Sequence, residues 1–216
     1  CDAVAAATGI QTDRIFTAST GVIGERLPHD RIIAKVNDLA AGLTSNGIND
    51  AAKAIMTTDT FPKGACAEVV IDGKTVRIAG IAKGSGMIAP DMATMLVYIF
   101  TDAKISQADL QTLLATLTDQ TFNCITVDSD TSTSDSLMCA ATGAPGVAVT
   151  NSAGFTQALH GVMLNLAHQN RQIPNHNFFP TGFQFFFTVK FHYFFIPFFY
   201  THLPLPTTLP LHISAI

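Results

Sequence analysis

The chain has 216 residues, and hydrophobic residues make up 48% of it, which is enough for one domain with a substantial core. Charged residues make up only 13% and the formal net charge is −4, which argues against nucleic-acid binding and against attachment to an anionic membrane. The four cysteines contain no CxxC pair, so they predict reduced thiols and a cytoplasmic protein. An organelle matrix is the alternative location if a transit signal precedes residue 1.

Alternating helical and strand patterns predict an α+β fold. In chain order, we expect a strand at 15–18, a helix at 30–44, a short helix at 50–56, strands at 67–71 and 75–81, a strand at 95–101, a helix at 106–117, a strand at 124–127, and helices at 134–141 and 152–169. Asp72-Gly73, between two strand-like runs, predicts a β-hairpin. Apolar residues from Phe155 to Leu166 have the spacing of a buried helix face.

The composition changes sharply after residue 169. All 16 acidic residues lie at or before Asp135, whereas 11 of the 16 phenylalanines lie at or after Phe178. We therefore treat 170–216 as a Phe/Pro-rich tail that is frameshifted or disordered, and assign no helix or strand to it. A membrane span at 183–200 is disfavoured because Lys190 and Pro197 interrupt the apolar run.

Residues 92–96 (MATML) carry the strongest chemical signal. They follow a glycine-rich loop at 83–91 and open an apolar run. If the bond between Ala93 and Thr94 breaks, Thr94 gains a free α-amine beside its hydroxyl. Such an amine, with a pKa of about 7.7–8.0, is a suitable base at neutral pH. Self-cleavage with Thr94 as nucleophile is one interpretation, and a β-branched residue that merely opens a strand is the other.

Four blocks of the chain have a distinctive order and spacing. They are 19–24 (STGVIG), 56–60 (MTTDT) with 62–63 (PK), 83–96 (KGSGMIAPDMATML), and 122–123 (FN) with 126–133 (TVDSDTST). In both respects the chain resembles the glutamate N-acetyltransferase/ornithine acetyltransferase family of arginine biosynthesis. The resemblance covers 1–169 and implies a layered sandwich with sheets packed between helices. It also implies a fragment, because the family has further sequence before residue 1 and a substrate-binding loop after residue 169.

The resemblance also assigns roles away from the cleavage point. Thr20 and Gly21 match the pair that stabilises the oxyanion, through a hydroxyl and a backbone N–H. Thr57 and Lys83 match substrate-binding positions, together with Thr94, and an ammonium and a hydroxyl are suitable ligands for a carboxylate. Without the resemblance, a plain turn after the first strand, a helix-terminal cap and a solvated loop lysine are the simpler interpretations.

The implied reaction is an acetyl transfer. After self-cleavage between Ala93 and Thr94, Thr94 accepts the acetyl group of N2-acetyl-L-ornithine as an ester and passes it to L-glutamate, in a ping-pong mechanism. The resemblance implies no metal and no organic cofactor, and it leaves open whether acetyl-CoA also serves as a donor. It divides the chain into an α-chain segment at 1–93 and a β-chain segment at 94–169, and implies a homo-oligomer of such heterodimers.

Three alternatives stay open. The chain is an inactive, truncated member of that family, a self-processing aminopeptidase-like hydrolase with the same nucleophile, or a membrane-anchored module whose anchor is the tail. A metal site is not supported, because the histidines form no HExxH pattern. Asp128, Asp130 and Asp135 lack the glycine and glutamate of a calcium loop, so we assign them to caps and turns.

Overall fold

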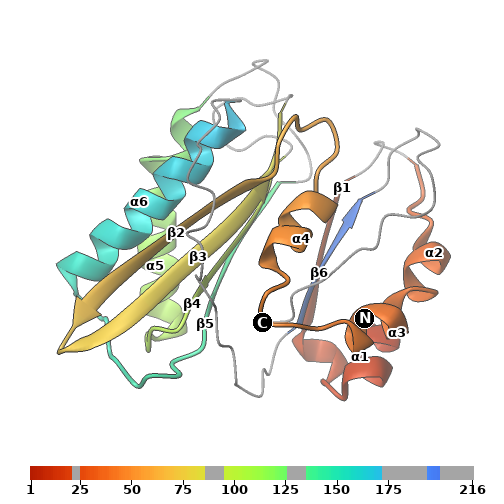
Figure 1. The fold of residues 1–216 in the computed structure, drawn as a ribbon, viewed down its shortest axis with the longest axis horizontal. Coiled ribbons are helices and arrows are strands. Elements are labelled where there is room, and N and C mark those ends of the chain that lie inside the picture. Colours follow the sequence, from red (N-terminus) through yellow and green to blue (C-terminus); the bar gives the residue numbers. More distant parts are fainter. Residues whose placement is uncertain (21–24, 86–94, 126–134, 172–193, 200–216) are drawn as a thin grey trace.

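The computed structural model describes residues 1–20, 25–85, 95–125, 135–171 and 194–199. Its elements form layers (Figure 1). Helices α5 and α6 cover one face of a four-stranded sheet, α4 and a two-stranded pair lie on the other side, and α1, α2 and α3 lie beyond that pair. Sheets therefore lie between helices, and the α+β class predicted from the sequence is confirmed.

The four-stranded sheet has the strand order β2-β3-β4-β5. The strands are β2 (Lys63–Ile71), β3 (Lys74–Lys83), β4 (Leu96–Thr101) and β5 (Ser136–Ala141). The first three are antiparallel, whereas β4 and β5 are parallel. Asp72 and Gly73 have φ angles of 52° and 74°, as the tight turns that suit a twisted hairpin require. The predicted hairpin is confirmed, with longer strands than expected.

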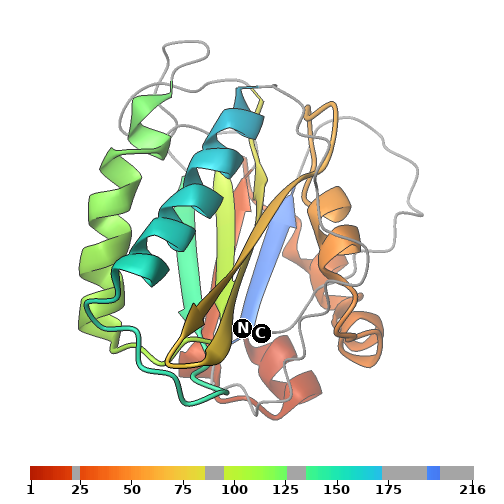
Figure 2. The same ribbon diagram turned by 60° about the vertical axis from the view of Figure 1, so that its left-hand side comes forward.

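Helices α5 (Gln107–Asp119) and α6 (Ala153–Asn170) lie side by side over the sheet (Figure 2). Each begins at a serine cap: the Ser106 hydroxyl accepts the N–H of Asp109 at 3.1 Å, and the Ser152 hydroxyl accepts that of Phe155 at 3.3 Å. The face of α6 predicted to point inward is buried: Phe155, Leu159, Val162 and Leu166. These side chains pack on the sheet and form the larger core.

A second core lies on the opposite face of the sheet. It joins Ala51, Ala52 and Ile55, at and just after α4 (Ile48–Ala54), to apolar residues of β3 and β4. Strand β1 (Ile15–Thr20) contributes Ala18 and pairs in parallel with β6 (Phe194–Phe199). Helices α1 (Asp2–Thr8) and α3 (Val36–Ala41) pack near β1 in a third, small cluster. Short 3₁₀ turns lie at Thr12–Arg14 and Phe122–Cys124.

Two predicted elements near the chain's start and middle are wrong. The helix expected at 30–44 is two helices, α2 (His29–Ile33) and α3, because the Lys35 N–H donates to the Ile32 carbonyl in a tight turn. That break leaves Ile33 50% exposed and buries Val36 against α1. The helix expected at 134–141 is strand β5, because pairing with β4 outweighs the helical propensity of its leucine, methionine and alanines.

Two further expectations need correction. Cys124 belongs to a 3₁₀ turn instead of a strand at 124–127, of which 126–127 lie outside the described residues. Strand β6 lies in the tail to which the pattern assigned no element, and helix α1 was not predicted. All four cysteines are free thiols. Over the ranges that the structure describes, no helix combines the length and apolar character needed to cross a membrane.

Candidate active site

Several elements end at one edge of the four-stranded sheet. Strand β3 ends at Lys83, whose register partner is Leu96, the first residue of β4; Leu96 in turn pairs with Ser136, the first residue of β5. Strand β2 begins beside them, with Lys63 opposite Ala82. Figures 1 and 2 show that β1 and α6 also end on this side of the molecule. Residues far apart in sequence therefore meet here.

Lys83 and Thr57, both assigned to substrate binding by the resemblance, are in contact. The Lys83 ammonium donates to the Thr57 hydroxyl at 3.0 Å. Lys83 is only 2% exposed and lies on the same sheet face as Ile81 and Leu96, which α4 covers. Thr57 follows the end of α4, so this helix brings the threonine to the end of β3. The solvated loop lysine considered for this position is not what the structure has.

A buried ion pair lies beside this contact. The carboxylate of Asp59 accepts a hydrogen bond from the Lys63 ammonium, and both side chains are 1% exposed. Lys63 also donates to the Gly84 carbonyl oxygen at 2.7 Å, and the Gly84 N–H donates to Asp59 at 2.9 Å. The second oxygen of Asp59 accepts the Thr57 N–H at 3.1 Å. Both charges are therefore compensated away from water.

Burial and neighbouring charges set the ionisation of this group of residues. Burial lowers the pKa of Lys83 to about 8; Asp59 and Asp135 act to raise it, and Lys63 acts to lower it further. Burial alone would raise the pKa of Asp59, but the hydrogen bonds from Lys63 and Gly84 hold it below its ordinary value. Burial lowers the pKa of Lys63, although Asp59 opposes that shift.

Asp135 joins the site from the start of β5. Its carboxylate accepts the backbone N–H of Met95 at 2.6 Å. Met95 is the residue that follows Thr94 in the sequence and is buried. The sequence pattern assigned Asp135 to a cap or turn, and its hydrogen bond to a backbone N–H is typical of such a residue. Its negative charge also acts to raise the pKa of Lys83. The residue therefore belongs to the candidate site.

Two of the proposed catalytic residues, Gly21 and Thr94, lie outside the described residues, as does Ala93 of the proposed cleavage site. Asp128 and Asp130 lie outside them too. Thr20 is the last residue of β1, and its backbone pairs with Phe199 of β6.

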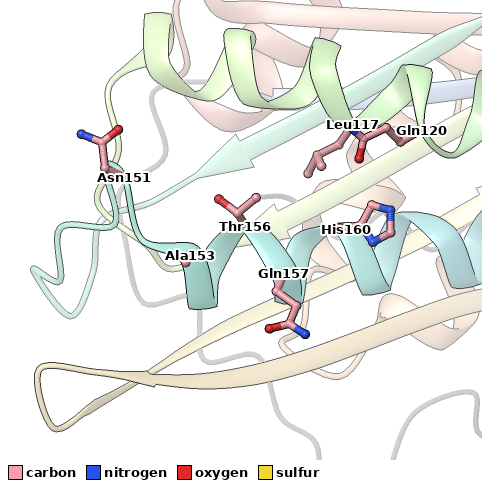
Figure 3. A pocket seen from close by; sticks show the side chains of 7 residues that line it. All are labelled: Leu117, Gln120, Asn151, Ala153, Thr156, Gln157 and His160. Atoms are coloured by element: carbon pink, nitrogen blue, oxygen red, sulfur yellow. The ribbon is translucent and has the colours of Figure 1, made fainter.

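The structure offers one further hollow of interest, on the other side of the sheet. Figure 3 shows it between α5 and α6, with Gln120 at the end of α5 and Gln157 and His160 on α6. None of its lining residues belongs to the group around Lys83. No cluster of three or more His, Cys, Asp or Glu side chains suited to a metal ion occurs in the described parts of the chain.

Sequence reasoning missed the roles of Asp59, Lys63 and Gln169. Asp59 and Lys63 are four residues apart, but they lie outside a helix, where this spacing does not by itself bring two side chains together. Gln169 bonds both backbone groups of Gly64, next to Lys63. No sequence signal connects residues 105 positions apart, so this contact requires the structure.

The sequence model of the ArgJ family matches residues 1–172, which is most of the chain. The chain belongs to the ArgJ family. The ArgJ match includes α1 through α6 and every described residue of the candidate site, whereas β6 lies outside it. The family resemblance drawn from the sequence blocks is therefore confirmed.

Curated ArgJ relatives are similar over the same part of the chain. The "Arginine biosynthesis bifunctional protein ArgJ" of Ruegeria pomeroyi is 65% identical over 167 residues, which cover 77% of this chain and 41% of that protein. Proteins of the same name from Gluconobacter oxydans and Caulobacter vibrioides are 59% identical over 172 residues and 53% identical over 161. The matches cover 77% and 72% of this chain, but only 41% and 40% of those relatives. The chain thus spans about two fifths of the length of the relatives it matches.

Proposed function

We propose that this chain is part of an acetyltransferase of arginine biosynthesis that moves an acetyl group from N2-acetyl-L-ornithine to L-glutamate. The observation that carries the proposal is the buried contact between Lys83 and Thr57 at the end of β3. Both substrates carry a carboxylate, and an ammonium beside a hydroxyl suits that group. The names of the ArgJ relatives support the pathway.

In this proposal, Thr94 supplies the covalent chemistry twice. Its hydroxyl first attacks the Ala93 carbonyl carbon, and the peptide bond to the Thr94 nitrogen breaks, which frees the Thr94 amine and leaves an ester. Water then hydrolyses this ester to the Ala93 carboxylate and the Thr94 hydroxyl. The same hydroxyl then takes the acetyl group, and ornithine leaves with the proton. Thr20 and Gly21 stabilise the oxyanion in both steps. The position of Met95, held by Asp135 near the Lys83 contact, supports a reaction at this edge of the sheet.

The division of the chain follows from this mechanism. Residues 1–93 form the first product and residues from 94 onward form the second, in a cytoplasmic protein that assembles as an oligomer of these pairs. Because the chain spans 41% of its relatives, we propose that it has little turnover by itself, since substrate contacts supplied by the rest of such a protein orient the reacting groups.

The experiment compares the purified chain with the variant Thr94→Ala. A denaturing gel and intact-mass measurement detect scission between residues 93 and 94, and addition of N2-acetyl-L-ornithine tests for an acetyl ester on the product. We expect two fragments from the parent chain and one band from Thr94→Ala. Thr116→Ala, an exposed threonine on α5, is the matched control and is expected to cleave like the parent. Scission that persists in Thr94→Ala would remove Thr94 from the mechanism, and release of amino acids from short peptides would favour a hydrolase.

A further inference from the structure

One carboxylate connects the two candidate substrate ligands. The two oxygens of Asp59 accept different backbone N–H groups, one from Thr57 and one from Gly84, which directly follows Lys83. Lys63 bonds the same carboxylate and also the carbonyl oxygen of Gly84. The peptide groups on both sides of Gly84 are therefore fixed by the pair. The same pair also fixes the backbone of Thr57.

We propose that Asp59 and Lys63 form a positioning pair that holds Lys83 against Thr57 and controls the charge environment of its ammonium. This inference rests on the proposed function, which gives Thr57 and Lys83 a carboxylate to bind. A binding pair of this kind needs its side chains held within about 0.5 Å of the productive geometry. The hydrogen bonds of Asp59 to the backbone of Thr57 and of Gly84, which follows Lys83, supply that restraint. The positions of Thr57 and Lys83 therefore do not depend on their side-chain contact alone.

The chemistry of the pair favours positioning over simple stabilisation. A buried ion pair is often no more stable than apolar side chains of the same volume, so stability by itself does not explain one here. Apolar side chains, however, cannot accept the N–H groups of Thr57 and Gly84 or bond the Gly84 carbonyl. Among the described residues, the charged groups that act on Lys83 are Asp59, Lys63 and, from the start of β5, Asp135.

The test follows the titration of Lys83 in the folded full chain. The ¹³Cε NMR signal of each lysine is recorded against pH, and the Lys83 signal is assigned by its absence from the Lys83→Arg spectrum. We expect Asp59→Asn to lower the Lys83 pKa and Lys63→Met to raise it, each by roughly one unit, because each removes one charge of opposite sign. A pair that has no part in the charge environment of Lys83 would instead leave its titration equal in both variants.

A second measurement covers the case in which a single variant does not fold. The double variant Asp59→Ala/Lys63→Met removes both charges together, so neither member of the pair is left as an unpaired buried ion. We expect it to fold, with amide hydrogen exchange at Gly84 about tenfold faster than in the parent chain, since the Gly84 N–H loses its acceptor. The control is the Val76 amide, which lies in β3 away from the pair, and its exchange is expected to stay unchanged.

The outcomes separate this inference from the proposed function. Titration shifts in opposite directions, or faster exchange confined to Gly84, support the positioning pair. Equal titration in two folded single variants, or unchanged exchange at Gly84 in the double variant, would overturn it. None of these measurements needs substrate or scission. A chain that shows the opposite shifts yet never cleaves at Thr94 would therefore contradict the proposed function alone.

Discussion

The side-chain amide of Gln169 bonds both backbone groups of Gly64. Its nitrogen donates to the Gly64 carbonyl oxygen at 2.9 Å, and its oxygen accepts the Gly64 N–H at 3.1 Å. Gln169 lies near the end of α6 and Gly64 near the start of β2, an edge strand of the four-stranded sheet. The amide therefore takes the place of a neighbouring strand and ties the helix to the edge beside Lys63.

Replacing Gln169 should destabilise the chain. The variant Gln169→Ala leaves both Gly64 groups buried without their partner, and we expect it to lower the free energy of unfolding by about 1–3 kcal/mol. Gln157→Ala, an exposed glutamine on the same helix, is the control and should change it by no more than about 0.5 kcal/mol. Urea unfolding at pH 7 measures both. Equal effects would show that the Gln169 amide contributes nothing specific.

Removing one partner of the Asp59–Lys63 pair should cost far more than removing both. We expect Lys63→Met to lower the free energy of unfolding by about 3–5 kcal/mol, because it leaves a carboxylate buried and unpaired. Asp59→Asn/Lys63→Met should recover most of that loss.

The surface pair Lys35–Asp38 supplies the control for this comparison. Its ammonium and carboxylate are 3.0 Å apart, but their side chains are 66% and 70% exposed. Lys35→Met should therefore change the free energy of unfolding by less than about 1 kcal/mol. A double variant of the buried pair that is no more stable than Lys63→Met would contradict the prediction.

The stability contributed by Lys83 should rise with pH in alkaline solution. Its pKa falls from 10.5 to about 8 on folding, so between these values the unfolded chain binds more protons than the folded chain. The free energy of unfolding of the parent chain, minus that of Lys83→Met, should increase by about 3 kcal/mol across this window. Exposed Lys53→Met is the matched control. A difference that stays flat from pH 8 to 10.5 would mean that Lys83 titrates at its ordinary pKa.

Two glycines should respond in opposite ways to alanine. A Cβ at Gly80 would lie 2.9 Å from Leu166 Cδ1 and 3.2 Å from Ile99 Cγ1, at the close contact of β3 with α6. Gly80→Ala should therefore lower the free energy of unfolding by about 1–3 kcal/mol. At Gly161, within α6, a Cβ meets no atom within 4 Å, and Gly161→Ala should raise stability by up to about 1 kcal/mol. Thermal unfolding of both variants tests the contrast.

Local signals predicted the elements that depend on neighbouring residues. The Asp72-Gly73 turn is complete within two residues and forms as predicted, and the helices predicted at 106–117 and 152–169 are confirmed as α5 and α6, each with a serine cap at its start. Strand β5 depends instead on the exposed edge of β4, and the break after α2 depends on the burial of Val36. No window of sequence contains those partners, so the pattern predicted helices in both places.

The candidate site likewise contains residues that were predicted from the sequence and residues that only the structure revealed. Thr57 and Lys83 were predicted as substrate ligands through the family resemblance, and they lie in contact although they are 26 residues apart. The resemblance gave no role to Asp59 and Lys63, whose partners are backbone groups of Thr57 and Gly84. Every residue has a backbone carbonyl and almost every residue has a backbone N–H, so the residue type does not show which of these groups a side chain will bond. The hydrogen bonds of Asp59 and Lys63 to the backbone could therefore not be predicted from the sequence.

A cut between residues 93 and 94 would fall between two hydrogen-bonded neighbours, β3 and β4. Six register pairs join these strands, and the larger core takes side chains from both sides of the cut, such as Ile78 from β3 and Leu159 from α6. The two products would consequently behave as a split protein. They should copurify through a tag on either piece and separate only in denaturant. When both pieces are refolded together, the pairing of β3 with β4 should form again and restore the folded protein.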